Sequence, residues 1–323
     1  MKLAFTARKE LTDYEWELTQ SFKNRMDLNR EMIRALSERS NMHGLLRVTL
    51  HSGSLVLLAW LSIAAARVHW ALAILPLYAY WFLYGFWVAL GHELQHKMVF
   101  RKSWERFGEI IYFFVQVFMW NSPRYARISH RLHHRYTMVR DVDPETDWPE
   151  VITSSWLRKY LSGLLQGIFL IGVPRSLFAN VRVQVERMAG KKDRMMRNHC
   201  SENDCQRIRI ESVAILGLHI LVVAGALWFW TPWPILLITV AWQIGSPMEA
   251  LWHSTEHLGR AYNVNDQRLA TRSVRVSPLI RLLYGGLDDH VDHHLFPSVP
   301  SMNLPRLHRL LDRELAPTRS MIG

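Results

Sequence analysis

Residues 70–96 read WALAILPLYAYWFLYGFWVALGHELQH. The first 21 residues of this stretch, Trp70 to Leu90, carry no charge, and an apolar run of that length can cross a bilayer. The run leads directly into His92 and His96, and a spacing of four residues puts two side chains on one face of a helix. The stretch therefore predicts a membrane-spanning helix with two imidazoles at one end.

Other apolar runs complete a membrane protein. Three more have the length of a span: Leu45 to Ala66, Ser212 to Trp230 and Pro234 to Trp252. The last carries Glu249, which is a functional candidate because ionisable residues are costly inside a bilayer, although pairing with an arginine would also explain it. Two shorter runs, Ile110 to Trp120 and Leu161 to Val173, predict interfacial or re-entrant segments.

These runs predict one all-α integral membrane domain over residues 1–323, with four transmembrane helices in two hairpins and a cytoplasmic helical cap around a histidine-box metal site. The expected parts are a cytoplasmic N-terminal helix (1–44), the first hairpin (45–91), the cap with the two interfacial segments (92–211), the second hairpin (212–252) and a cytoplasmic C-terminal region (253–323). Thr12 and Glu15 fit a capping box that would begin the N-terminal helix.

The basic residues predict the orientation. Of the 39 lysines and arginines, only Arg67 lies in the two short turns that join the spans. The positive-inside rule therefore places both termini and the histidine boxes in the cytoplasm. The same asymmetry accounts for the net charge of +11, so no nucleic-acid partner is expected.

Ten of the 16 histidines form two sets with one pattern, HxxxH followed by HxxHH. The sets are His92, His96, His130, His133 and His134, and then His253, His257, His290, His293 and His294. Clustered imidazoles would need many hydrogen-bond partners if no metal were present. Imidazole suits Zn, Cu, Fe and Ni, and one ion takes about four to six ligands, so the sets predict about two ions.

The remaining histidines and the nearby acids have plainer interpretations. His51 and His219 are read as core residues, and the surface candidates are His43, His69, His199 and His308. A metal-bound histidine usually donates its other ring N–H to a carboxylate or carbonyl. The acids that could accept it are Glu93, Glu249, Glu256, Asp289 and Asp292. Asp141, Asp143 and Asp147 could also accept it, but the stretch from Asp141 to Asp147 is equally well read as a solvated acidic loop.

Three boxes carry a family resemblance. His92-Glu-Leu-Gln-His96, His130-Arg-Leu-His-His134 and His290-Val-Asp-His-His294 resemble those of the membrane fatty acid desaturase and alkane hydroxylase superfamily. The run from His293 to Pro300 is similar to the C-terminal box of bacterial acyl-lipid desaturases.

The resemblance implies a non-haem di-iron centre, O₂ as co-substrate and a location in the bacterial inner membrane. Nine ligands follow from it by position: His92, His96, His130, His133, His134, His257, His290, His293 and His294. His253 is either a tenth ligand or a side chain that hydrogen-bonds to a ligand or bound water. The implied partners are the lipid bilayer, an acyl or other apolar substrate, and a separate electron donor of the ferredoxin, rubredoxin or cytochrome b5 type.

Alternatives remain at this stage. The first box is HxxxH, a form found in alkane hydroxylases where many desaturases have HxxxxH, so the product is either an alkene from an acyl chain or an alcohol from an aliphatic or other small substrate. A membrane zinc metalloprotease is a third possibility, because residues 92–96 read HExxH. It would leave both HxxHH boxes without a role. A di-haem carrier is disfavoured because the histidines gather at span ends.

Overall fold

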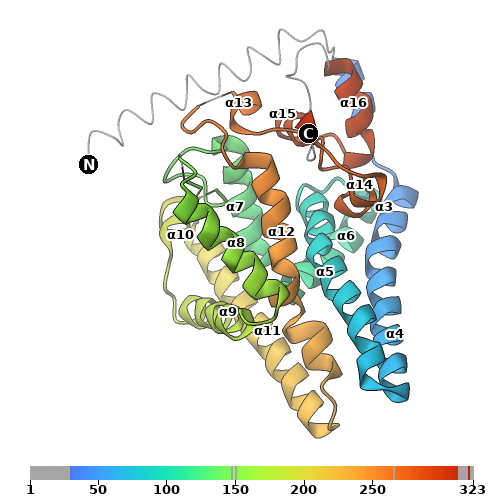
Figure 1. The fold of residues 1–323 in the computed structure, drawn as a ribbon. Coiled ribbons are helices and arrows are strands. Elements are labelled where there is room, and N and C mark those ends of the chain that lie inside the picture. Colours follow the sequence, from blue (N-terminus) through green and yellow to red (C-terminus); the bar gives the residue numbers. More distant parts are fainter. Residues whose placement is uncertain (1–29, 147, 150, 265, 312–318, 321–323) are drawn as a thin grey trace. The chain divides into compact units, whose positions relative to one another are not determined.

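The computed structural model describes residues 30–146, 148–149, 151–264, 266–311 and 319–320. The contacts between residues group into two compact units, each built from segments that are distant in sequence. Figure 1 labels the helices and strands, coloured along the chain. We call residues 40–129 and 152–252 the span unit, and residues 1–39, 130–151 and 253–323 the histidine unit. The predicted capping box at Thr12 and Glu15 lies outside the described residues, and the single domain stays a prediction.

The first hairpin lies in the span unit. Helix α3 (Asn41–Val48), the π-helical turn η1 (Thr49–Gly53) and α4 (Ser54–Val68) form one candidate span, and η2 (Trp70–Ala73) with α5 (Ile74–Gln95) forms the next. His69 separates them because its backbone is extended, and its Nδ1 accepts from the backbone N–H of Ala71 at 3.3 Å. A break is therefore found where the sequence predicts a turn at Arg67 to His69, but it is confined to His69, because Arg67 and Val68 belong to α4.

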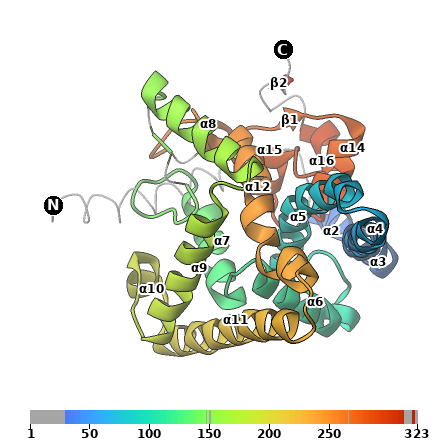
Figure 2. The same cartoon turned by 60° about the horizontal axis from the view of Figure 1, so that its bottom comes forward.

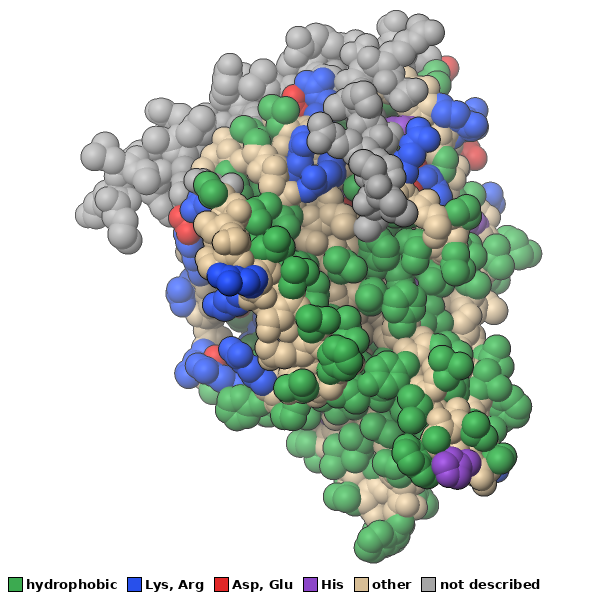
Figure 3. All heavy atoms as spheres, viewed as in Figure 1, with side chains coloured by type: hydrophobic (Ala, Val, Ile, Leu, Met, Phe, Trp, Pro, Cys, Tyr) green, Lys and Arg blue, Asp and Glu red, His purple; other side chains and the backbone are tan. Residues whose placement is uncertain are grey.

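The second hairpin contains α11 (Glu202–Trp228), the π-helical turn η4 (Ile235–Thr239) and α12 (Ala241–His257). A capping box between Ser201 and Asp204 begins α11 ten residues before the predicted apolar run. Within the part of the chain that the structure describes, four helices are therefore long and apolar enough to cross a membrane, as the sequence predicts. Apolar side chains dominate the face of this unit seen in Figure 3, as a lipid-facing surface requires.

The two hairpins contact each other closely. A Cβ on Gly85 of α5 would clash with the carbonyl oxygen of Gly245 of α12, so the helices cross at glycines. The irregular turn η4 displaces backbone carbonyls from the usual helical ladder. Side chains supply donors to them: Tyr80 Oη to Leu237 O at 2.5 Å, Trp81 Nε1 to Leu236 O at 2.9 Å and Trp120 Nε1 to Thr239 O at 2.9 Å. No carbonyl of these three residues is left to face lipid without a donor.

The shorter apolar runs do not form straight spans. After η3 (Lys102–Trp104), α6 (Glu105–Phe118) exposes apolar side chains along one face. Helices α8 (Ser154–Ile168) and α9 (Val173–Met188) bend by 95° at the break between them. Their different directions can be followed in Figure 2. That bend is compatible with the predicted re-entrant segment and with a broken span. The short α10 (Arg194–His199) precedes α11.

The histidine unit consists of short elements around one apolar core. These are α2 (Arg30–Leu36), α13 (Gln267–Ala270), β1 (Val274–Arg275), α14 (Pro278–Tyr284), α15 (His290–Leu295), η5 (Ser301–Asn303), α16 (Leu304–Leu311) and β2 (Arg319–Ser320), with β1 and β2 paired in parallel. Leu295 of α15 packs with Leu36, Leu304, Leu307 and Leu311. A six-residue helix is not stable alone, so this core fixes α15 in place.

Candidate metal centre

Helix α7 (Pro123–Tyr136) carries the box His130, His133 and His134. Pro123 is its first residue, and Ser122 Oγ accepts from the backbone N–H of Tyr125 at 3.1 Å, so the helix begins with a favoured first residue and a side-chain cap. Consecutive residues of a helix point about 100° apart, whereas residues i and i+4 nearly align. His130 and His134 therefore share a face, and His133 points elsewhere.

Helix α15 carries the box His290, His293 and His294 in the same pattern, and all three are buried. Its first turn is held by Ser273, whose Oγ accepts from the backbone N–H of Val291 at 3.1 Å. The last residue of α12, His257, is also fully buried. These three helices bring seven box histidines into the histidine unit.

Four of the seven form what we call the four-histidine group: His133, His257, His290 and His294. Each offers one ring nitrogen, and these nitrogens lie within 4.8 Å of one another. Nε2 of His290 is 3.0 Å from Nε2 of His257 and also 3.0 Å from Nε2 of His294. One nitrogen thus meets two others at hydrogen-bond distance.

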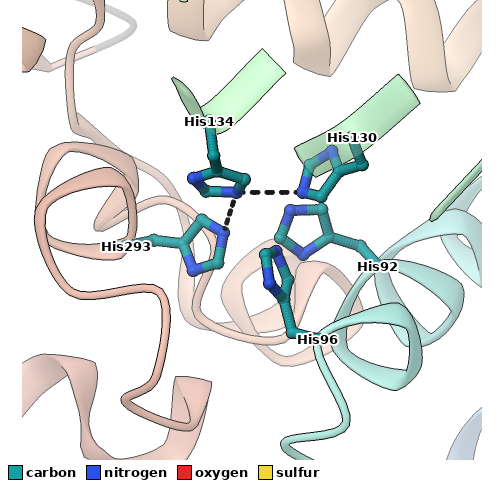
Figure 4. A group of neighbouring side chains, drawn as sticks. All are labelled: His92, His96, His130, His134 and His293. Atoms are coloured by element: carbon teal, nitrogen blue, oxygen red, sulfur yellow. Dashed lines mark hydrogen bonds between the residues drawn. The ribbon is translucent and has the colours of Figure 1, made fainter. Parts of the chain in front are cut away.

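The other three form the three-histidine group: His130, His134 and His293. Nε2 of His134 lies 3.0 Å from Nε2 of His130 and 3.1 Å from Nε2 of His293, as Figure 4 shows. The arrangement repeats that of the four-histidine group, with one Nε2 contacted by two others.

The Nδ1 atoms of these histidines face protein oxygens. His257 Nδ1 donates to the carbonyl of Ala270 at 3.3 Å. The Thr137 hydroxyl donates its hydrogen to the carbonyl of His133 at 2.6 Å. Its oxygen therefore accepts from His294 Nδ1 at 3.1 Å. A neutral imidazole carries one ring proton, so Nε2 of His257 and of His294 is bare.

Two carboxylates hold further rings. His133 Nδ1 lies 3.0 Å from Asp143 Oδ2, and His130 Nδ1 lies 2.9 Å from Glu145 Oε2. Asp143 is buried and also accepts from the backbone N–H groups of Met138 and Glu145, each at 2.9 Å, and from Thr146 Oγ1. The loop after α7 therefore wraps around one carboxylate that orients His133.

The donor set fits a metal ion. His290 Nε2 lies 3.0 Å from two nitrogens that carry no proton, Nε2 of His257 and Nε2 of His294. One N–H on His290 Nε2 could donate to only one of them, so the other contact would bring two lone pairs together. His134 Nε2 likewise lies at hydrogen-bond distance from two ring nitrogens, His130 Nε2 at 3.0 Å and His293 Nε2 at 3.1 Å. Converging lone pairs repel unless a cation lies among them. Rings fixed through Nδ1 with Nε2 pointing inward are the usual state of histidine ligands.

The electrostatics agree with that state. Burial and the neighbouring imidazoles, His290 first, lower the pKa of His294 well below its ordinary value and keep the ring neutral. Burial alone would lower the pKa of His133, but the Asp143 carboxylate raises it. Burial alone would likewise raise the pKa of Asp143, but His133 and its other donors lower it. Asp143 therefore stays ionised and accepts a hydrogen bond from His133 Nδ1, which keeps its proton.

The remaining predicted ligands are placed as follows. His92 and His96 lie one turn apart at the end of α5, with ring centroids 5.0 Å apart (Figure 4). His253 directs Nε2 at the carbonyl of Glu145 at 3.2 Å and Nδ1 at Glu256 Oε2 at 3.6 Å. Its ring nitrogens thus face oxygens, unlike the Nε2 atoms of the four-histidine group.

The acidic candidates divide by partner. Glu256 Oε1 accepts from Tyr284 Oη and lies 3.2 Å from His290 Nδ1, so it contacts a box histidine, and its role in orienting a metal ligand stays a prediction. Glu93 forms a buried ion pair with Arg47, with 2.8 Å between Oε2 and Nη2. Glu249 lies on α12, half-buried, one turn before His253.

The two aspartates of the last box have partners outside the boxes. Asp289 accepts from Arg281, and Asp292 Oδ2 accepts from His308 Nδ1 at 2.9 Å. The reading of His308 as a surface residue is wrong, because it is half-buried against a fully buried carboxylate. Burial raises the pKa of Asp292.

Among the other histidines, the core readings of His51 and His219 are confirmed. His51 is buried, with Nδ1 3.1 Å from the carbonyl of Arg47, and His219 stacks on Trp120 with 3.8 Å between ring centroids.

Glu145 and the Ala270 carbonyl were not found from the sequence, and the role of Asp143 was left open. Asp143 and Glu145 follow α7 at no diagnostic spacing, and Asp143 stood inside a stretch equally well read as a solvated loop. Asp147 of that stretch lies outside the described residues. The carbonyl of Ala270 carries no sequence signal, since every residue has one.

Comparison with known proteins gives the family. The fatty acid desaturase family matches residues 67–322, which include the second span of the first hairpin, the whole second hairpin and all ten box histidines. A comparison with curated proteins finds no match. With the four candidate spans and the two converging histidine groups, the match establishes that this oxidoreductase belongs to the fatty acid desaturase family.

Proposed function

We propose that the protein is an O₂-dependent di-iron enzyme that introduces a double bond into an acyl chain or similar lipid-like substrate. One iron would be held by the four-histidine group. The other would be held by the three-histidine group together with His92 and His96, whose assignment rests on the sequence pattern. Imidazole nitrogen is a suitable donor for iron, and seven to nine ligands exceed what one ion takes.

The observation that carries the proposal is the repeated convergence of three Nε2 atoms at 3.0–3.1 Å, around His290 and around His134. Two such points in one unit favour two ions. A zinc protease would need Glu93 as a free general base, but that carboxylate is buried in an ion pair with Arg47.

The chain's own residues prepare the site. Asp143, Thr137 and the Ala270 carbonyl keep the protons of their histidines on Nδ1, so that Nε2 can bind metal. Burial of the four-histidine group excludes bulk water, which protects an oxidising reaction from side reactions. When bound, the two irons supply activation of O₂ against an unactivated C–H bond.

The proposed reaction converts CH₂–CH₂ to CH=CH and reduces O₂ to two waters, with two electrons and two protons from outside. The electrons would come from a separate ferredoxin, rubredoxin or cytochrome b5-type protein. The charge asymmetry favours a cytoplasmic site, where such donors are found.

Product analysis tests the proposal. Protein loaded with iron is supplied with O₂, a reducing donor and acyl substrates on different carriers, and the products are examined by mass spectrometry. We expect a product that has lost two hydrogen atoms. Gain of one oxygen atom would instead establish the hydroxylase, and peptide cleavage without O₂ would establish the protease.

A further inference from the structure

A pocket lined by three arginines lies in the span unit, and two of them, Arg124 and Arg127, come from the start of α7, ahead of its histidine box. The pocket has a volume of about 330 Å³ and opens between α6, the start of α7 and the start of α11. Its apolar wall is formed by Ile110, Phe113 and Phe114, and its polar wall by Arg124, Arg127 and Arg207. Glu109 is the one carboxylate among the lining residues, whereas the carboxylates that pair with Arg124 and Arg207 do not line the pocket.

The pocket lies at the level where a membrane surface is expected. Arg207 belongs to the charged first turns of α11, and the apolar part of that candidate span begins at Ser212. On the neighbouring α6, Ile110 is 56% and Phe114 49% exposed, which is favourable against lipid and costly in water. Arginines that meet exposed apolar residues at a span end are typical of the headgroup region.

The arginines are positioned but retain donors. Arg127 makes a two-pronged ion pair with Glu109 at 2.9 and 3.1 Å and lies over the Tyr112 ring at 4.4 Å. Its Nε is buried and has no partner within the described residues. A guanidinium has five N–H donors in a rigid fork, so a pair of this kind orients the group and does not exhaust it.

The other two arginines are also held by an ion pair that leaves some of their N–H donors available. Arg124 Nε donates to Asp204 at 2.6 Å, and Arg207 Nε donates to Glu211 at 3.2 Å. The Arg207 side chain is 67% exposed, so its terminal NH₂ groups reach the surface. The partners Asp204 and Glu211 are largely shielded and do not line the pocket.

We propose that this pocket binds the phosphate of an anionic membrane phospholipid. Arg124 and Arg207 would donate to the phosphate oxygens, and the acyl chains would lie along Ile110, Phe113 and Phe114. The combination of clustered guanidinium groups with an apolar wall favours a phosphodiester that carries hydrocarbon over a free anion. Such a site would anchor the protein to anionic lipid, and it stands independently of the reaction at the metal centre.

The test is native mass spectrometry of the full chain in detergent with equal amounts of phosphatidylglycerol and phosphatidylcholine. Wild-type protein is expected to retain phosphatidylglycerol preferentially. Arg207→Gln should weaken that retention about fivefold, since one basic residue near a lipid surface contributes about 1 kcal/mol. Arg207→Lys should recover most of it.

Arg182→Gln is the matched control. Arg182 is also 67% exposed and also donates to a glutamate four residues later, Glu186 at 3.1 Å, but it lies outside the pocket. Equal lipid loss in both glutamine variants would overturn the proposal. So would equal retention of the two lipids by wild-type protein, which needs no variant. Displacement of the bound lipid by millimolar inorganic phosphate would show a soluble anion site and contradict the lipid assignment.

Discussion

The two histidine groups use the same two helices in opposite ways. Helix α7 gives its i and i+4 histidines to the three-histidine group and only His133 to the four-histidine group. Helix α15 gives its i and i+4 histidines to the four-histidine group and only His293 to the other. Adjacent histidines of an HxxHH box therefore serve different groups, because they point about 100° apart. Each proposed ion depends on both helices.

The groups differ in how they are enclosed. The Asp143 side chain that orients His133 is fully buried, whereas the Glu145 side chain that contacts His130 is 26% exposed. A charge-assisted hydrogen bond is stronger where water cannot compete. We therefore expect the four-histidine group to depend more on its surrounding residues than the three-histidine group does.

The largest effects are expected from His290→Ala and His134→Ala, which remove the nitrogen contacted by two others in each group. Each variant should lose turnover and fall from about two irons per chain to about one or fewer. Iron analysis with an activity assay measures this. His199→Ala, at an exposed histidine outside the boxes, should keep both. Full iron in either box variant would break the proposed division into two groups.

His257→Ala and His253→Asn separate a ligand from a neighbour. His257 has its Nδ1 on the Ala270 carbonyl and a bare Nε2 beside His290, so its loss should cost one iron. His253 faces the Glu145 carbonyl and Glu256, so His253→Asn should keep both irons and measurable turnover. Equal iron loss in the two variants would make His253 a direct ligand.

Asp143→Asn and Glu145→Gln sharpen the difference in enclosure. Loss of the Asp143 charge should weaken iron binding or activity about 10- to 100-fold, as expected for a residue that orients a ligand. The more exposed Glu145→Gln should cost less, on the order of tenfold at most. Metal competition titrations give both values. A larger effect at Glu145 would reverse the proposed order.

The smallest effect is expected from Asp292→Asn. An amide oxygen can still accept from His308 Nδ1, so iron content should change little. Burial raises the pKa of Asp292, which means that its ionised form opposes folding and stability is lost as pH rises through that pKa. Asp292→Asn should therefore be at least as stable as wild type at neutral pH in thermal unfolding. A drop of both irons would show that Asp292 acts on a box histidine.

The spans and the box histidines could be predicted from the sequence because their signals are local. Trp70 to Leu90 carries its own length and polarity, and the HxxHH spacing fixes which side chains share a helix face. The pairing of each histidine with its oxygen partner could not be predicted, because Asp143 reaches His133 through a loop and the Ala270 carbonyl is a backbone group. His308 was misread because its partner, Asp292, is brought to it by the packing of α16 against α15.

The most direct test of the central claim is the metal content of wild-type protein purified from cells grown with iron and zinc. Two histidine groups with converging Nε2 atoms predict about two irons per chain. These irons should be lost together with activity on chelation and regained with iron. A single zinc per chain, with activity that does not require iron, would contradict the account.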